Sequence, residues 1–548
     1  MTVRPASAAA VIVLGLAFSP IVSAAPPAAA AGQSAPVSVT MIATLKAPQR
    51  TTGFINPLML ASYTSEFGLL TRQLDQVINR AVVIGIDPSV IASIRILGSS
   101  APPTATAWLA RLENATNETF PLAWADADLT APLQAGSGAV LLPESIDFAI
   151  DPENFPTPVE PDSPTPTPEP TQTPTVESPL PTLESLTAWN YTIDSIAWPQ
   201  MNSVTNADLA ILDRSFDTTI VSSENIGSPD ARTARKTIDH AQVLVSDASL
   251  SALFDTAVDA GPAEEWQAAV ASLAAAVGAV PSSTEDSAAV LIALDRRTDT
   301  SDTDLGPTID ALAASADVRT IGIDELLRTQ TRSTELVDAP QPSSTLDAVK
   351  KLLVDETADR DFAQIAENPA LITGERRLNL LATLSNSWAE RAASWGLARA
   401  TFDTASTALR SRVKIVKSST ITLWADRASL PVTVSNELEQ SVTVYVRVRP
   451  VTPLLKVEDS FVAVTVEPNS QRKASIPVQS LSNGTVELVV TVNSVAGEQI
   501  GATTYVRTTV QAGWETPVTI AAGIIVVLIF AMGIVRTILR RRTTRTEA

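Results

Sequence analysis

The sequence has no cysteine among its 548 residues and only one histidine, His240. The missing thiols exclude disulfides, thiolate metal sites, iron–sulfur clusters and cysteine nucleophiles. One imidazole cannot supply the paired histidines of a zinc hydrolase, so no metal and no other cofactor is expected. Stability must therefore come from buried apolar cores, and a chain of this length can form them in two or more domains.

Common motifs and positive charge are also scarce. The sequence holds no GxGxxG, GxxxxGK[ST], GxSxG or HExxH motif, which removes the commoner nucleotide-binding and hydrolase signatures. Only 39 Lys and Arg stand against 59 Asp and Glu, which leaves a formal net charge of −20. Such an acidic surface repels phosphate backbones, so nucleic acid is not expected as a partner.

The longest hydrophobic run lies near the C-terminus. Residues 518–535 read VTIAAGIIVVLIFAMGIV without an ionisable side chain, which is long enough to span a membrane as one helix. Five arginines follow the run closely: Arg536, Arg540, Arg541, Arg542 and Arg545. Because Lys and Arg gather on the cytoplasmic side, this bias predicts that the tail is cytoplasmic and that everything before the helix lies outside the membrane.

The N-terminus has the pattern of a signal peptide. Arg4 precedes an apolar run over residues 8–22, and small residues follow at a cleavage site near residue 24. The protein is therefore expected to be single-pass in the cell membrane, with extracytoplasmic domains. The predicted segments are a signal peptide (1–24), the first part of an α/β domain (34–154), a Pro/Thr-rich insert (155–182), the second part of the α/β domain (183–342), a helical segment (343–410), an Ig-like β-sandwich (411–512), a transmembrane helix (517–536) and a basic tail (537–548).

Strand and helix patterns alternate in the predicted α/β domain. Residues 81–87 (AVVIGID) and 288–294 (AAVLIAL) are continuously apolar, as in strands that are covered on both faces. Helical patterns, such as the one over residues 247–260, separate strands of this kind. About eight strands alternate with helices in this way, including strands predicted over residues 120–125 and 192–198. This alternation predicts a largely parallel sheet and makes a (β/α)-barrel-like arrangement a hypothesis.

Three other segments have different patterns. Prolines recur every second or third residue over 155–182, so this insert is predicted to be extended or disordered, either as a spacer or as a PxxP peptide ligand. Residues 343–410 are predicted to be helical, with a leucine and tryptophan stripe that packs in a core. From residue 411 the apolar period changes to two, which predicts an immunoglobulin-like sandwich with a hairpin at Asn483 and Gly484.

Candidate functional residues follow the strands of the predicted α/β domain. Ligands of parallel α/β domains bind beyond the carboxyl ends of the strands. Five aspartates occupy such positions: Asp87, Asp126, Asp128, Asp247 and Asp295. With Trp124 and Trp198 nearby as candidate ligand-binding residues, they would suit a carbohydrate cleft with an acid and a base or nucleophile.

Some of these polar residues can also be explained by a purely structural role. An aspartate directly after a strand commonly caps the next helix, and both Asp87 and Asp247 are placed to do so. His240 lies at the start of its predicted strand, so it should face the opposite edge of the sheet, and we interpret it as structural.

A set of segments resembles a known family in the same order along the chain. The segments are VVIGIDPSVI, FPLAWADADL, IAWPQ, AQVLVSDASL, AAVLIALDRR, LPVTVSNELEQSVTVYVRV and NGTVELVV. They resemble an uncharacterised actinobacterial family of exported envelope proteins with a C-terminal membrane anchor. The resemblance implies an α/β region loosely similar to polysaccharide-deacetylase or glycosidase barrels, an Ig-like module and one membrane helix. Members are often encoded beside a MurJ-like lipid II flippase, which implies a role near cell-wall precursor export.

These features predict a membrane-anchored envelope protein without enzymatic activity that binds cell-wall glycan or a membrane partner such as a flippase-like protein. The family has no established catalytic residues, so none is carried over. The alternative is a metal-independent glycoside hydrolase that uses paired Asp carboxylates, which would stand roughly 5 Å or 6.5–9.5 Å apart in a cleft. A weaker hypothesis is that the membrane helix itself contacts a multispanning partner.

Overall fold

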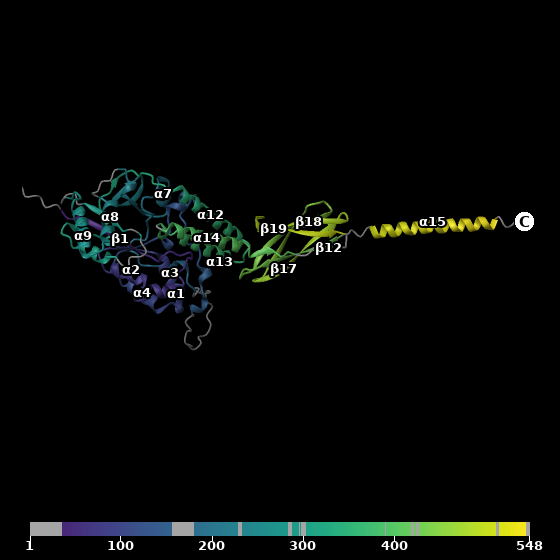
Figure 1. Ribbon diagram of the computed structural model, residues 1–548, viewed down its shortest axis with the longest axis horizontal. Helices are drawn as coiled ribbons and strands as arrows, with labels where there is room; N and C mark the ends of the chain where they lie inside the picture. Colours follow the sequence, from purple (N-terminus) through teal and green to yellow (C-terminus); the bar gives the residue numbers. More distant parts are fainter. Residues whose placement is uncertain are drawn as a thin grey trace, which may run out of the picture.

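The computed structural model shows an α/β part with a helical region, a β-sandwich and a C-terminal helix in line (Figure 1). It describes residues 35–155, 180–227, 233–282, 288–294, 296, 303–389, 391–417, 421–423, 427–510 and 515–543. The predicted signal peptide, most of the proline-rich insert and Asp295 lie outside the described residues.

The sheet of the α/β part is built from mostly parallel strands. They are β1 (Val37–Leu45), β2 (Val83–Ile86), β3 (Thr119–Pro121), β4 (Ile196–Ala197), β5 (Thr218–Ser222), β6 (Arg235–Ile238), β7 (Ala241–Ser246), β8 (Ala289–Ala293), β9 (Val318–Thr320) and β10 (Arg332–Ser333). Parallel pairing links β3, β2, β1, β8, β7, β5 and β4 in that order. The described residues contain no ladder between β3 and β4, so a closed barrel stays a prediction.

Helices cover this sheet. They are α1 (Pro57–Tyr63), α2 (Leu69–Val77), α3 (Pro88–Arg95), α4 (Pro103–Glu113), α5 (Thr130–Gln134), α6 (Leu183–Thr187), α7 (Asn206–Leu212), α8 (Ala248–Val258), α9 (Ala263–Gly278), α10 (Leu305–Ala313) and α11 (Ile323–Leu327). Short 3-10 turns include η2 (Trp124–Asp126), η5 (Ser223–Asn225) and η6 (Asn386–Trp388). Every residue of β2 and β8 is buried, as the continuous apolar runs predicted, and every residue of β5 is buried as well.

The structure corrects several expected elements. The strand expected over residues 120–125 ends at Pro121, because Ala125 and Asp126 have φ angles of 58° and 52° and turn the chain through η2. The strand expected over residues 192–198 is reduced to β4. The sequence patterns also missed β6, which forms an antiparallel hairpin with β7. The exposed His240 lies in that hairpin turn, at the amino end of β7 and away from the carboxyl strand ends.

Three long helices lie between the sheet and the sandwich. They are α12 (Ser343–Ala363), α13 (Pro369–Thr383) and α14 (Ala392–Arg410). Two ion pairs are buried where they pack: Arg376 lies 2.7 Å from Asp359, and Arg377 lies 2.6 Å from Glu356. Because desolvated charges are costly when a partner is missing, these pairs fix the helices against each other.

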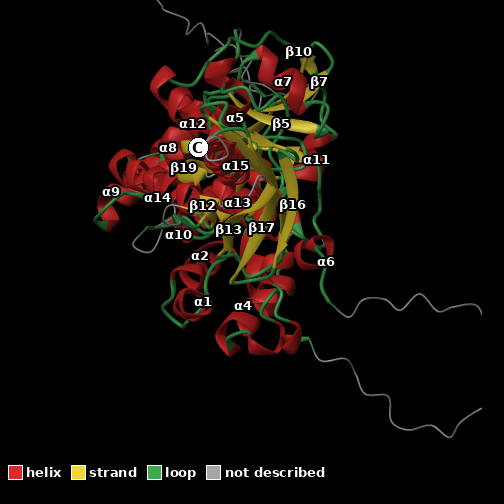
Figure 2. Ribbon diagram, turned by 90° about the vertical axis from the view of Figure 1, so that its right-hand side faces the viewer, coloured by secondary structure: helices red, strands yellow, loops and turns green. Residues whose placement is uncertain are grey.

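The sandwich contains two sheets, which Figure 2 shows from the C-terminal side with α15 end-on. Its strands are β11 (Val413–Ile415), β12 (Ile421–Leu423), β13 (Arg427–Asn436), β14 (Val442–Pro450), β15 (Leu455–Val457), β16 (Phe461–Val466), β17 (Ser470–Ser480), β18 (Gly484–Asn493) and β19 (Gln499–Val510). One sheet has the order β11-β13-β17-β15, and the other has the order β12-β19-β18-β14-β16.

The expected hairpin at Asn483 and Gly484 is wrong. β17 pairs with β13 and β15, whereas β18 pairs with β14 and β19, so the connection crosses from one sheet to the other. Gly484 has a φ angle of 150°, a conformation that side-chain-bearing residues rarely adopt. A turn-forming dipeptide therefore reverses the chain here without pairing its flanking strands.

The last helix, α15 (Glu515–Thr543), is long and apolar enough to cross a membrane over Val518–Arg540. The helix projects from the rest of the fold (Figure 1), and its apolar side chains are exposed instead of packing in a core. This arrangement is consistent with a membrane anchor.

Candidate functional site

Residues that follow three different strands meet at the carboxylate of Asp126. Lys46 follows β1 and places its Nζ 2.7 Å from Oδ2 of Asp126. Arg296 follows β8 and places its Nη1 2.9 Å from Oδ1 of the same residue. Lys46 is completely buried and Asp126 is 1% exposed, so both ion pairs are desolvated. Each carboxylate oxygen of Asp126 is therefore engaged by one cation, and the buried carboxylate is not accessible to a substrate.

The turn that carries Asp126 is also held from the helical region. The amide nitrogen of Asn386, in η6, donates to the backbone oxygen of Asp126 at 3.0 Å and to its Oδ1 at 3.4 Å. Aspartate tolerates the left-handed conformation of this position better than most residues. The connection between α13 and α14 is thus tied directly to the strand ends.

Asp87 caps the helix that follows its strand. Its Oδ1 accepts hydrogen bonds from the backbone nitrogens of Ser89 and Ala125, both at 2.9 Å. Arg50 stands 3.9 Å away, too far for a hydrogen bond. Burial raises the pKa of the Asp87 carboxyl above its ordinary value, and Arg50 offsets only part of that rise. The capping alternative for this residue is confirmed.

Two other aspartates are likewise engaged with backbone. Asp128 accepts hydrogen bonds from the nitrogens of Thr130 and Ala131 at 2.8 and 3.2 Å, and burial raises its pKa. Asp247 accepts a bond from the nitrogen of Leu250 at 3.0 Å and caps α8, as the capping alternative predicted. Asp87 and Asp126 thus lie close enough to interact, while Asp128 and Asp247 serve separate turns.

The two candidate tryptophans are buried rather than open. Trp124 packs edge-on against Phe54 and donates its indole N–H to the oxygen of Gly53 at 3.2 Å. The guanidinium of Arg296 lies 4.2 Å from the ring centroid of Trp198, and Arg296 also donates to the Trp198 carbonyl. Both indoles are less than 5% exposed, so neither presents a free face on which a sugar could stack.

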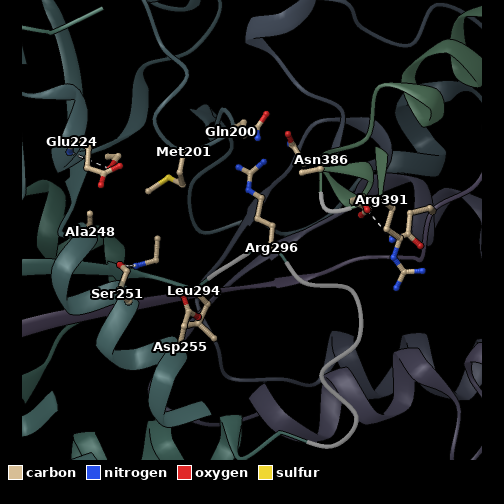
Figure 3. A pocket seen from close by; sticks show the side chains of 16 residues that line it. Gln200, Met201, Glu224, Ala248, Ser251, Asp255, Leu294, Arg296, Asn386 and Arg391 are labelled. Atoms are coloured by element: carbon tan, nitrogen blue, oxygen red, sulfur yellow. Dashed lines mark hydrogen bonds between the residues drawn. The ribbon is translucent and has the colours of Figure 1, made fainter. Parts of the chain in front are cut away.

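A cavity of about 470 Å³ opens beside this cluster (Figure 3). Its lining comes from the strand ends, from α8 and from the segment around η6: Gln49, Gln200, Met201, Ser222, Glu224, Ala248, Ser251, Ala252, Asp255, Ala293, Leu294, Arg296, Asn386, Ser387, Ala389 and Arg391. The volume is in the range of small-molecule sites. Arg296 joins the cavity to the Asp126 cluster, because it belongs to both.

Sequence reasoning missed Lys46 and Asn386. Lys46 directly follows β1, just as Asp87 follows β2, so the rule that selected the aspartates would have found it if basic residues had been included. Asn386 has no such signal, because it comes from the helical region and is 260 residues from Asp126. Among the described residues, no group of three or more His, Asp and Glu side chains is arranged to hold a metal ion.

Comparison with solved structures gives only weak likenesses. The α-amylase AmyC from Thermotoga maritima is 9% identical, with a TM-score of 0.40, and the match covers 69% of this chain and 93% of AmyC. A native α2-macroglobulin fragment from Escherichia coli is 17% identical with a TM-score of 0.16, over 18% of this chain and 16% of that one. WR4, a Caenorhabditis elegans MSP family member, is 12% identical with a TM-score of 0.15, over 18% of this chain and 98% of that one.

At these TM-scores the likenesses support no conclusion about fold or function. The chain spans less than a fifth of the macroglobulin fragment that it matches. The comparison with curated proteins gives no match. A family model, in contrast, matches residues 62–546, which is most of the sequence. The chain therefore belongs to a family of unknown function, DUF6049.

Proposed function

We propose that this protein is a membrane-anchored protein of the cell envelope that binds glycan in the cavity beside Asp126 and does not cleave it. The observation that carries the proposal is the contrast between the cavity and the aspartates. The cavity wall offers amide, hydroxyl, carboxylate and guanidinium groups from Gln200, Ser251, Glu224 and Arg296. The four candidate aspartates that the structure describes, in contrast, accept hydrogen bonds from helix caps and turns or form ion pairs.

The proposed topology places the α/β part and the sandwich outside the membrane. It is supported by the apolar stretch Val518–Arg540 and by the arginines that gather at its end. The signal-peptide pattern of residues 1–24 supports the same orientation. In this arrangement the sandwich, which we propose to be Ig-like, is a spacer that holds the cavity away from the membrane surface.

We also propose that the α/β part is a barrel of the (β/α) type. The strand order supports this, because it runs from β3 through β1 and β8 to β4, as it would around an opened ring. The backbone nitrogen of Thr192, just before β4, donates to the oxygen of Thr119 in β3 at 2.9 Å. Ligands of such folds bind at the carboxyl ends of the strands, where the cavity lies.

The proposed setting is the export or assembly of cell-wall precursors in an actinobacterial envelope. It rests on the resemblance of segments such as VVIGIDPSVI and LPVTVSNELEQSVTVYVRV to envelope proteins encoded beside a MurJ-like flippase. A flippase-like membrane protein is accordingly the proposed partner. Co-purification after crosslinking of the intact protein in its membrane tests this part separately.

The alternative proposal is a metal-independent glycoside hydrolase. It rests on the interacting pair Asp87 and Asp126 at neighbouring strand ends, since two carboxylates are the minimum such an enzyme needs. Both carboxylates are 1% exposed, however, and both oxygens of Asp126 are engaged by cations. A general acid or nucleophile must reach the glycosidic bond, so the buried geometry favours binding over cleavage.

The full chain in lipid nanodiscs, mixed with purified cell-wall glycan, tests the two proposals together. We expect retention of glycan without release of reducing ends, and the same retention by Asp87→Asn. Release of reducing ends that Asp87→Asn abolishes would establish the hydrolase instead. If the parent chain showed no retention of glycan and no release of reducing ends, both proposals would be contradicted.

A further inference from the structure

Two polar side chains in the cavity wall have atoms that no described residue pairs. Oδ1 of Asn386 and Oγ of Ser387 have no hydrogen-bond partner among the described residues, although each residue is only 8% exposed. Both residues line the cavity. An unpaired buried polar atom is costly, so groups of this kind are usually satisfied by a ligand or by water. Their position makes the cavity the place where such a partner would sit.

The orientation of the Asn386 amide is determined by its neighbours. Its nitrogen faces the backbone oxygen and Oδ1 of Asp126, and both of these atoms are acceptors. Exchanging the amide oxygen and nitrogen would place two acceptors against each other. The nitrogen must therefore face Asp126, which leaves Oδ1 on the cavity side, where Figure 3 shows the side chain directed toward Gln200 and Arg296.

The backbone of the segment that carries these two residues is held by one hydrogen bond from outside and by one within the segment. Nε2 of Gln49 donates to the backbone oxygen of Ser387 at 2.8 Å. The nitrogen of Ser387 donates to Oγ of Ser385 at 3.3 Å, which caps η6. Because the backbone is fixed, Oδ1 and Oγ are presented in a defined position, and preorganised groups bind with a smaller entropic cost.

The rest of the lining indicates the kind of ligand. Within the described residues the lining includes no aromatic side chain, so a ring cannot be held by stacking there. Met201 and Leu294 supply aliphatic surface, and Glu224 adds an acceptor. Because Arg391 and Gln200 also bring donors to the lining, such a site suits a ligand whose hydroxyl or amide groups both donate and accept and that has some aliphatic C–H surface, which is the chemistry of a saccharide.

We infer that Asn386 and Ser387 are ligand-binding residues that take hydrogen bonds from the hydroxyl or amide donors of a short saccharide bound edge-on. This inference rests on the proposed glycan-binding function and adds to it the groups that recognise the ligand. It predicts that recognition depends on hydrogen bonds that the ligand donates to these two atoms and not on either tryptophan, because the ring of Trp198 is already covered by Arg296.

Calorimetric titration of the full chain in nanodiscs with two trisaccharide probes tests the inference. Chitotriose and cellotriose share a β-1,4 backbone and differ at C2, where one has an acetamido group and the other a hydroxyl. Ser387→Ala removes only an Oγ that has no hydrogen-bond partner among the described residues, so it should not lower the melting temperature but should weaken binding about three- to tenfold. Asn386→Ala should weaken binding at least as much.

The chain offers matched controls for both variants. Asn225 is completely buried, donates its amide hydrogens to the oxygens of Val204 and Val337, and has an unpaired Oδ1 among the described residues, but it does not line the cavity. Oγ1 of Thr508, in the sandwich, likewise has no hydrogen-bond partner within the part of the chain that the structure describes. Asn225→Ala and Thr508→Val should therefore bind both probes as the parent does.

Each outcome has a distinct meaning. Weaker binding by Ser387→Ala with unchanged binding by Thr508→Val supports the inference, and a larger loss with one probe identifies which donor at C2 is recognised. Binding of a probe that neither Ser387→Ala nor Asn386→Ala weakens overturns the inference while the proposed function stands. No binding of either probe by the parent chain overturns both.

Discussion

The α/β part and the sandwich bury their strands in different ways. Strands such as β2 and β8 are buried on both faces, whereas β14 alternates buried and exposed residues. The α/β part and the helical region also bury ionisable side chains, including Lys46, Asp126 and Arg376. In the described residues of the sandwich, the buried polar side chains are only Ser, Thr and Asn.

This difference separates a part that adds buried ion pairs to its apolar core from a part whose buried side chains are apolar or uncharged. Buried ion pairs stabilise a fold weakly compared with apolar packing of similar volume, but the loss of one partner is costly. Two of the pairs, those of Lys46 and Arg296 with Asp126, lie at the strand ends beside the cavity, which is consistent with a role in positioning the site. The sandwich has no comparable cluster in its described residues, which fits a spacer.

Asp126→Asn should have the largest effect and would sharpen the comparison. The substitution preserves shape and tolerates the left-handed backbone, but it leaves Lys46 and Arg296 without their carboxylate. We expect a loss of about 3–5 kcal/mol in the free energy of unfolding, measured by denaturant titration of the full chain in micelles. The control is Asp75→Asn, which breaks the half-exposed pair with Arg111 and should cost at most about 1 kcal/mol. Equal effects would contradict the view that the buried cluster supports the fold.

Leu488→Ala tests the apolar side of the comparison. Leu488 is completely buried in the sandwich core, so its truncation should cost about 2–5 kcal/mol through lost burial and a residual cavity. Thermal unfolding followed by near-ultraviolet circular dichroism measures the loss. Saccharide binding below the melting temperature should be unchanged, and a parallel loss of affinity would show that the sandwich is more than a spacer.

Asn436→Ala should have an intermediate effect in the same domain. The amide nitrogen of Asn436 donates to the oxygens of Gln440, Val466 and Glu467, and its Oδ1 accepts from the nitrogen of Leu438. Leaving these groups unpaired should cost about 1–3 kcal/mol, measured by denaturant titration. Thr443→Val, at an exposed position, should stay within about 0.5 kcal/mol of the parent. A neutral Asn436→Ala would mean that polar side chains contribute little to the sandwich.

Asp87→Asn should have the smallest effect on the free energy of unfolding. Its effect should appear mainly as a change in how that free energy depends on pH. Burial raises the native pKa of Asp87, so the native state binds this proton more tightly than the unfolded state. The contribution of this tighter proton binding to the free energy of unfolding is fully present below the ordinary carboxyl pKa of about 4. It declines as the pH rises toward the raised pKa of Asp87 in the native state. The variant should remove this decline, so its free energy of unfolding should fall less between pH 4 and pH 7 than that of the parent. A steeper fall in the variant would contradict the assigned direction.

Much of the organisation could be predicted from local patterns. The continuous apolar runs predicted β2 and β8 within one or two residues, because a strand that is buried on both faces needs apolar residues at every position. Asp87 and Asp247 were recognised both as candidates and as caps, and the structure shows the caps. The turn at Trp124–Asp126 was missed, because Ala125 has no preference for a positive φ and tertiary contacts hold it there.

The sequence by itself determined the features that depend on neighbouring residues. The apolar stretch of α15, the change of period at the sandwich and the position of Asp87 directly after its strand all follow from local composition. Only the tertiary structure decided that Lys46, Arg296 and Asn386 converge on Asp126, across separations of 80, 170 and 260 residues. Such partners are chosen by packing and by the cost of leaving a buried charge unpaired, and no short sequence pattern records either.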